Sequence, residues 1–193
     1  MKKFKIPQIV NFIFILIGLL GFLLPYATST TKQKQFLLSN PDVIAISELN
    51  MKYRDMIDLS MLKYFRVDLY VVNNPEKIIF ARTDVMVDLV LISILAVSIL
   101  FIVLFTLLNK PIGNIVFAFI MLGASLIMNY DMVSRGVIPS ESYTYGITYY
   151  LYVILAIAII ICSIANIVVN KIDKKESYKL IELSSSTIEI VAN

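Results

Sequence analysis

The stretch LVLISILAVSILFIVLFTLL, residues 89–108, contains no charged side chain and only three hydroxyl groups. A helix of about 20 apolar residues crosses the roughly 30 Å hydrocarbon core of a bilayer. Apolar stretches of comparable length follow at residues 111–130 and 147–170, and a shorter one at residues 9–24 is interrupted only by Asn11. Because lipid cannot hydrogen-bond to free backbone N–H and C=O groups, we expect all four stretches to be helices.

The composition of the whole chain agrees with a membrane protein. Hydrophobic residues make up 59% and charged residues 16% of the 193 residues, whereas about 25% of an ordinary soluble domain is charged. We therefore predict a membrane all-α bundle of four transmembrane helices, with a small extracytoplasmic α+β cap between helices 1 and 2. Its expected parts are residues 1–26 (cytoplasmic N-terminus and first span), 27–83 (cap), 84–109 (second span), 110–130 (third span), 131–146 (short outer loop), 147–170 (fourth span) and 171–193 (cytoplasmic tail).

The first apolar stretch also has features of a cleaved signal peptide, because Lys2, Lys3 and Lys5 form a basic segment before it. Two features favour a retained anchor instead. The stretch exceeds the usual signal-peptide core of about 7–15 residues. It also ends at Pro25-Tyr26, where a tyrosine suits the membrane interface.

Positive charges near the ends of the apolar stretches predict their orientation. If there are four spans, eight lysines fall on one side, whereas the loop between the third and fourth spans has only Arg135, near Asp131 and Glu141. We therefore expect a plasma-membrane protein with both termini in the cytoplasm and the cap outside. The excess of lysine over arginine and the abundant isoleucine favour a bacterial source. The eight lysines are Lys2, Lys3, Lys5, Lys110, Lys171, Lys174, Lys175 and Lys179.

The pattern of residues 27–83 predicts a folded cap. Asn40-Pro41-Asp42 is typical of a helix start, and apolar residues then recur at helical spacing, so we expect a helix over residues 41–64. Strand-forming residues at 67–71 and 77–82, on either side of a turn signal, predict a strand pair. Residues 176–193 are expected to be a loose tail or a short strand. Tyrosines expected at the outer interface are Tyr143, Tyr145, Tyr149, Tyr150 and Tyr152.

Asp84 and Asp88 form an acidic pair one helical turn apart at the expected outer end of the second span. Two carboxylates there could bind a cation or a basic partner at the membrane surface. The structural alternative is that they complement the positive end of the helix dipole. Asp88 lies one turn deeper, where a charge is expensive, so we expect Arg82 or Arg135 to pair with it.

A second polar group is predicted at the cytoplasmic ends of the spans. Asn11, Thr106, Asn114 and Asn166 each belong to a different helix at similar depth. They could form a polar path for an ion or small solute, or they could hold the helices together by interhelical hydrogen bonds of about 0.6 kcal/mol each. No acid or base lies in the middle of any span, which counts against proton-coupled or charged-solute transport.

Motifs for enzymatic chemistry are weak. Ser60 and Lys63 match the S-x-x-K pattern of serine acyl enzymes, but the accompanying S-D-N and K-T-G elements are missing. Cys162 is the only cysteine, so the cap cannot contain an intramolecular disulfide. We predict neither a metal site nor a cofactor, and no enzyme.

The order of elements, with a large first outer loop containing strands and a small second loop, resembles the topology of claudin-type membrane proteins. The tryptophan and paired cysteines of such a first loop are absent, since the chain has no Trp and only Cys162. The resemblance therefore implies a topology and no site residues.

These observations favour a non-enzymatic binding or assembly subunit that acts through its cap, such as an immunity-type or complex-accessory protein. The expected partners are membrane lipid and a membrane or extracytoplasmic protein or a second copy of the chain, with no nucleic acid. A small channel or transporter component that uses the asparagine layer is the alternative, and a membrane-bound Ser/Lys hydrolase is a third hypothesis. The expected partner-binding residues are Tyr53, Met56, Tyr64, Tyr70 and Phe80.

Overall fold

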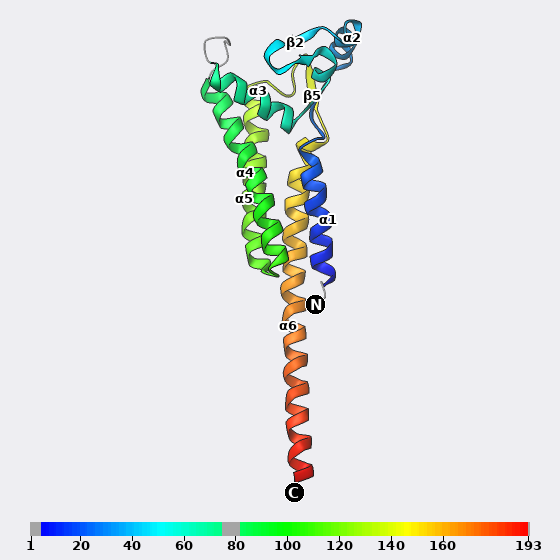
Figure 1. The fold of residues 1–193 in the computed structure, drawn as a ribbon, viewed down its shortest axis with the longest axis vertical. Coiled ribbons are helices and arrows are strands. Elements are labelled where there is room, and N and C mark those ends of the chain that lie inside the picture. Colours follow the sequence, from blue (N-terminus) through cyan, green and yellow to red (C-terminus); the bar gives the residue numbers. More distant parts are fainter. Residues whose placement is uncertain (1–4, 75–81, 193) are drawn as a thin grey trace.

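Long apolar helices form the body of the protein (Figure 1). The computed structural model describes residues 5–74 and 82–192, without the side chains of residues 82–83, 176–177 and 179–192. Within that part, three helices are long and apolar enough to cross a membrane, namely α4 (Arg82–Leu107), α5 (Pro111–Ser134) and α6 (Thr148–Ala192). They indicate a membrane protein. The prediction of four spans is met only in part, because α1 (Ile6–Gly21) has 16 residues.

The four helices pack as one bundle, in which α5 lies between α4 and α6, and α1 contacts α6 and α4. The turn between α4 and α5 is tight. Asn109 ends α4 with a positive φ of 53°, a conformation that asparagine tolerates, and the N–H of Lys110 returns to the carbonyl of Phe105 at 2.8 Å. Gly113 is required there because a Cβ would lie 2.5 Å from the Phe105 ring.

A three-stranded antiparallel sheet joins the two loops that are expected to be the outer ones. β1 (Pro25–Ser29) is the central strand, between β4 (Asp58–Ser60) and β5 (Tyr143–Tyr145). Ala27 is paired with Leu59 on one side and Tyr145 on the other. At the end of β5, the N–H of Gly146 donates to Tyr26 at 2.9 Å, and a Cβ at Gly146 would lie 2.3 Å from the carbonyl oxygen of Pro25. The cap is thus built from both outer loops.

The expected helix over residues 41–64 is wrong up to Ser60, whereas residues 61–64 begin a helix, α3 (Met61–Asn73). After α2 (Thr31–Ser39) this stretch forms β2 (Ile44–Ile46), η1 (Ser47–Leu49), β3 (Met51–Lys52), η2 (Tyr53–Met56) and β4. Asn50 lies between η1 and β3 with a positive φ of 51°, which no α-helix accommodates.

The strand predicted at residues 67–71 is also wrong, because these residues lie in α3 (Met61–Asn73). The Ser60 hydroxyl caps this helix by accepting the N–H of Lys63 at 3.3 Å. Packing against α4 outweighs the strand preference of Val67, Tyr70 and Val71. Of the second predicted strand, residues 77–81 lie outside the described residues, and Arg82 begins α4.

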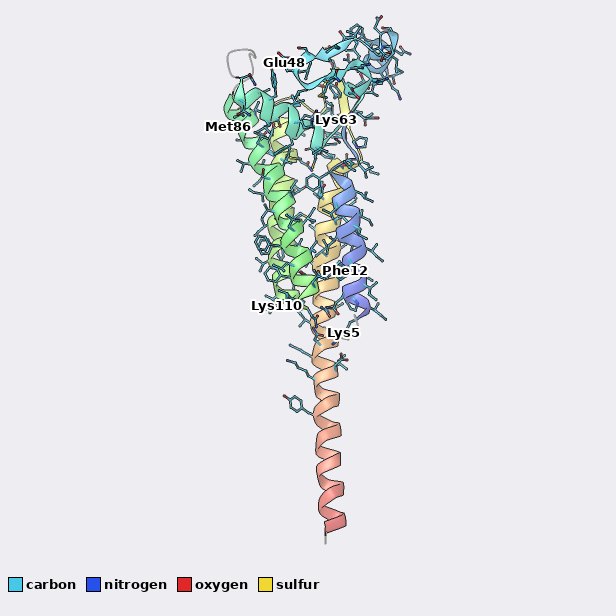
Figure 2. The ribbon with its side chains drawn as sticks, in the orientation of Figure 1. Lys5, Phe12, Glu48, Lys63, Met86 and Lys110 are labelled. Atoms are coloured by element: carbon cyan, nitrogen blue, oxygen red, sulfur yellow. The ribbon has the colours of Figure 1, made fainter. Side chains whose placement is uncertain are left out.

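The last helix is longer than expected. α6 continues through the predicted tail to Ala192, so the expectation of a loose tail or short strand is wrong, and Figure 1 shows it projecting beyond the bundle. Figure 2 shows Lys5 and Lys110 near this end of the bundle, whereas Glu48 and Lys63 lie in the cap. Tyr152, expected at the interface, is fully buried and donates its hydroxyl to the Gly18 carbonyl at 3.0 Å.

Candidate functional site

A charged cluster lies where the cap meets the bundle. Arg135 directly follows α5, and its Nη2 donates to both carboxylate oxygens of Asp88, at 2.8 and 2.7 Å. The same nitrogen donates to Asp131, one turn earlier on α5. Asp88 on α4 is only 4% exposed. Arg135 therefore neutralises a buried carboxylate and connects the ends of α4 and α5 that lie beside the cap.

Asp68 of α3 adds a second buried carboxylate to this region. It is 7% exposed, and its Oδ2 has no hydrogen-bond partner. Burial and, to a lesser extent, the charge of Asp88 raise the pKa of Asp68 to about 7, although the Arg135 charge acts in the opposite direction. Asp68, Asp88, Asp131 and Arg135 are called the outer charged cluster below.

The outer charged cluster has more acids than bases, so it can hold a proton near neutral pH. The acid suited to this is Asp68, because its buried Oδ2 has no hydrogen-bond partner among the described residues. Among the described side chains, no group of three or more His, Cys, Asp or Glu is arranged to hold a metal ion. Asp84, the other member of the predicted acidic pair, is half-buried one turn before Asp88.

Tyrosines and an amide tie the sheet to the helices beside this cluster. The Tyr26 hydroxyl donates to Asn129 Oδ1 at 2.8 Å, and Asn129 Nδ2 donates to the Tyr149 carbonyl at 3.0 Å. The rings of Tyr26 and Tyr64 pack edge to face, with their centroids 5.9 Å apart. Burial raises the pKa of both hydroxyls, so they stay neutral at physiological pH. This arrangement holds β1 and α3 over the bundle.

The predicted amide layer lies inside the opposite end of the bundle. Asn114 on α5 donates to the hydroxyl of Thr106 on α4 at 2.9 Å. Asn11 on α1 donates to Ser163 on α6 at 3.3 Å, and Asn166 donates to Asn109 in the turn between α4 and α5 at 3.0 Å. The layer therefore consists of separate bonded pairs, and only Asn114 and Thr106 bond to each other.

Each asparagine of the layer has an unsatisfied oxygen. The Oδ1 atoms of Asn11, Asn114 and Asn166 are buried and have no hydrogen-bond partner, and these residues are at most 2% exposed. Buried amide oxygens are normally paired. These three amide oxygens remain available as acceptors, so they can accept a hydrogen bond from water or coordinate a cation.

The residues expected to bind a partner occupy different environments. Tyr53 lies in the cap, half-buried, with its ring centroid 5.8 Å from that of Phe36. Met56 and Tyr64 pack against the hydrophobic core of the bundle. Tyr70 is half-buried on α3, and Phe80 lies outside the described residues. Tyr53 is thus in contact with an exposed apolar residue, since Phe36 is 57% exposed.

The Ser60 and Lys63 side chains are used structurally. The Ser60 hydroxyl caps α3, while Lys63 Nζ donates to the carbonyls of Asp55 and Asp58, at 2.6 and 2.9 Å. The lysine amine is therefore committed to backbone carbonyls. The S-x-x-K spacing reflects the beginning of a helix, and nothing in this geometry favours the hydrolase hypothesis.

Some residues of these sites were missed in the sequence. Asp68 was assigned to a strand. It is the single acid of α3, and the apolar residues on either side of it in the sequence were the available signal of its burial. Ser163 and Gln8 also belong to the amide layer. Ser163 accepts from Asn11, and Gln8 donates to the Thr106 carbonyl at 3.3 Å. No protein-family model, no curated protein and no solved structure matches this chain.

Proposed function

We propose that this protein is a plasma-membrane protein with four spans and cytoplasmic termini, and that it acts as a non-enzymatic binding or assembly subunit. Its cap would recognise a protein partner outside the membrane, while the helices anchor it. An immunity-type or complex-accessory role is one version of this function.

The observation that carries the proposal is an exposed apolar patch on the cap. Phe36 on α2 is 57% exposed, and Val43 and Ile44, at the start of β2, are 45% and 53% exposed. Tyr53 joins them, because its ring contacts Phe36 and its N–H donates to the Val43 carbonyl at 2.9 Å. These four residues are called the cap patch.

The position of the cap patch favours a protein over lipid as its cover. α2 and β2 lie at the far side of the cap from the helical bundle (Figure 1). By contrast, the exposed leucines of α3, Leu62 and Leu69, line grooves against the membrane-spanning helix α4. An apolar patch away from the bilayer is typical of a protein interaction site.

The rim of the cap patch is charged. Asp42 directly precedes Val43 and forms ion pairs with Lys52 at 3.0 Å and Arg54 at 3.4 Å. An apolar centre with a polar, solvent-accessible rim is the usual anatomy of a protein interface. This supports a protein partner.

The test is a double substitution, Phe36→Ser with Ile44→Ser, in the tagged full-length chain. The partner is the protein that co-purifies stoichiometrically with the wild type after mild detergent extraction and is identified by mass spectrometry. Because truncating a hot-spot residue at an interface costs at least about 2 kcal/mol, we expect the double variant to lose nearly all of this partner. The control is Leu38→Ser, which is 49% exposed but lies about 200° around α2 from Phe36. It should retain the partner. Undiminished capture by the double variant would refute the role of the cap patch.

The unsatisfied oxygens of the amide layer favour a second candidate, a channel or transporter component. In that case, Asn114→Leu should abolish flux of an alkali-metal cation through proteoliposomes, because it removes a coordinating oxygen. Asn40→Leu, an exposed change in the cap, is the control and should conduct like the wild type. If wild-type proteoliposomes conduct no more than empty ones, this candidate is refuted.

A further inference from the structure

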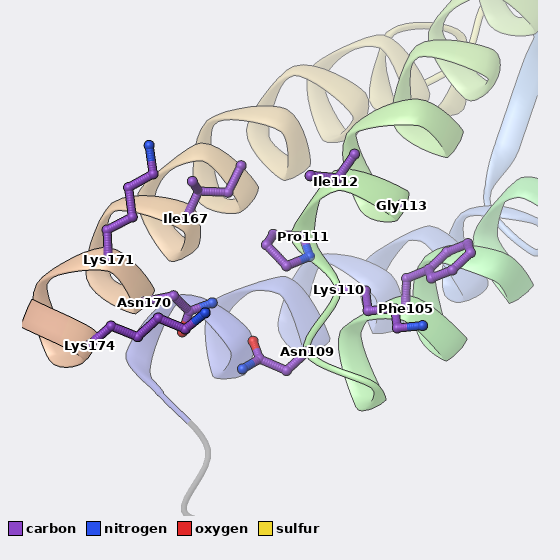
Figure 3. A pocket seen from close by; sticks show the side chains of 10 residues that line it. All are labelled: Phe105, Asn109, Lys110, Pro111, Ile112, Gly113, Ile167, Asn170, Lys171 and Lys174. Carbon is purple, nitrogen blue, oxygen red and sulfur yellow. The ribbon is translucent and has the colours of Figure 1, made fainter. Parts of the chain in front are cut away.

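We propose that a pocket at the end of the bundle opposite the cap binds the phosphate headgroup of an anionic phospholipid. The pocket has a volume of about 430 Å³ and lies between the α4–α5 turn and α6. Its polar side is formed by Lys110, Lys171 and Lys174. Its apolar side is formed by Phe105, Ile112 and Ile167 (Figure 3).

The positive charge of this pocket is not neutralised by an ion pair within the part of the chain that the structure describes. Within the described residues, no carboxylate forms an ion pair with any of its three lysines. Asp173, on the same part of α6, forms its ion pair with Lys5 of the N-terminal segment. Figure 3 shows the Lys174 side chain extending from α6 toward the α4–α5 turn, beside Asn109. All three lysines line the same pocket. In Figure 3 the amines of Lys110 and Lys171 extend away from Lys174, so these two flexible side chains would turn inward to meet a headgroup.

The pocket lies at the level of lipid headgroups. Lys110 separates the two spanning segments that end at Leu107 and begin at Pro111, and the spanning part of α6 ends at Lys175. The N-terminus of α5, a helix of 24 residues, opens on the pocket through Pro111 and Gly113 and adds the positive end of its dipole. Both features favour a bound phosphate.

The apolar wall distinguishes a phospholipid from a free anion. Ile112 is 71% exposed beside the lysines, and Phe105 stacks on Phe101 and Phe117 along the bundle. An acyl chain can continue from the headgroup along this surface, whereas a free anion would leave it uncovered. Basic pockets between spanning helices are established sites for acidic lipid headgroups. The proposal needs membrane insertion but does not depend on a partner for the cap.

The experiment compares lipids by native mass spectrometry of the full-length protein purified in mild detergent. Phosphatidylglycerol is expected to bind more tightly than phosphatidylcholine. Because a lysine beside a bound acidic headgroup contributes about fivefold in affinity, Lys174→Gln should weaken phosphatidylglycerol binding about fivefold, and Lys110→Gln with Lys174→Gln about 25-fold, since both residues line the pocket. Lys175→Gln removes the same charge from the next residue of α6, which does not line the pocket, and should weaken binding less than twofold.

Three results would overturn the proposal. One is equal affinity for the two lipids, and another is an equal loss in Lys174→Gln and Lys175→Gln, which would reflect unspecific attraction. The third is displacement of phosphatidylglycerol by millimolar inorganic phosphate, which would assign the pocket to a free anion. Unchanged circular dichroism and elution volume of the variants, with the expected affinities, support a lipid site.

Discussion

Replacing Arg135 with glutamine is expected to lower the free energy of unfolding by about 3–5 kcal/mol, because it leaves a buried carboxylate without its counter-ion. Asp88 is 4% exposed and receives two hydrogen bonds from Arg135. Asp131 loses its ion pair as well. The measurement is unfolding by SDS in mixed micelles, followed by circular dichroism.

Arg54→Gln is the matched control for this prediction. Arg54 also pairs with an aspartate, Asp42, at 3.4 Å, but their side chains are 57% and 71% exposed. Ion pairs of this kind contribute about 0–1 kcal/mol. Adding Asp88→Asn to Arg135→Gln removes the unpaired charge and should restore part of the stability. If Arg135→Gln unfolds like Arg54→Gln, the outer charged cluster does not stabilise the bundle.

The helices were predictable from the sequence because hydropathy alone specifies them. A run such as residues 89–108 has no folded alternative in lipid, and α4, α5 and α6 contain the three long stretches. The apolar stretch at residues 9–24 is different, since α1 ends at Gly21 and the chain turns into β1 at Pro25. Its length falls between a core helix and a span, so composition does not decide its role.

The cap was predicted poorly because its elements depend on contacts that are distant in sequence. β1 pairs with a strand more than 30 residues later and with another more than 110 residues later, through Ala27 opposite Leu59 and Tyr145. β1 carries no strong strand pattern, and β5 consists of strand-forming residues but is only three residues long. α3 has strand-forming residues, but its position on α4 makes it a helix.

The two polar sites illustrate what a sequence position can indicate. The amide layer was predictable, because a polar residue in an apolar helix marks its own depth along that helix. Its bonding was not, since Ser163 and Asn109 were not recognised as acceptors for Asn11 and Asn166. Arg135 was foreseen as a partner for Asp88, whereas Asp68 required the fold of the cap.

Asp68→Asn is expected to stabilise the protein at pH 8 by about 2–4 kcal/mol and to change its stability little at pH 4. The pKa of Asp68 is about 7 in the folded protein, chiefly because of burial, compared with about 3.9 in an unfolded chain. Between these values the folded state binds the proton and the unfolded state does not. Stability due to this group therefore falls as the pH rises from about 4 to about 7 and stays low above it.

The measurement is the same SDS unfolding at pH 4, 6 and 8. Asp42→Asn is the control of opposite sign, because a hydrogen bond from Lys52 and the charges of Lys52 and Arg54 lower the pKa of Asp42. That variant should not gain stability at pH 8. Groups that face Asp68, namely Asp88, Arg135 and Tyr64, are unchanged in Asp68→Asn, so the difference between variant and wild type isolates one carboxyl group. A difference in unfolding free energy that does not grow between pH 4 and pH 8 would show that Asp68 is ionised and solvated in the folded protein. The packing of α3 on the bundle would then not depend on protonation of Asp68.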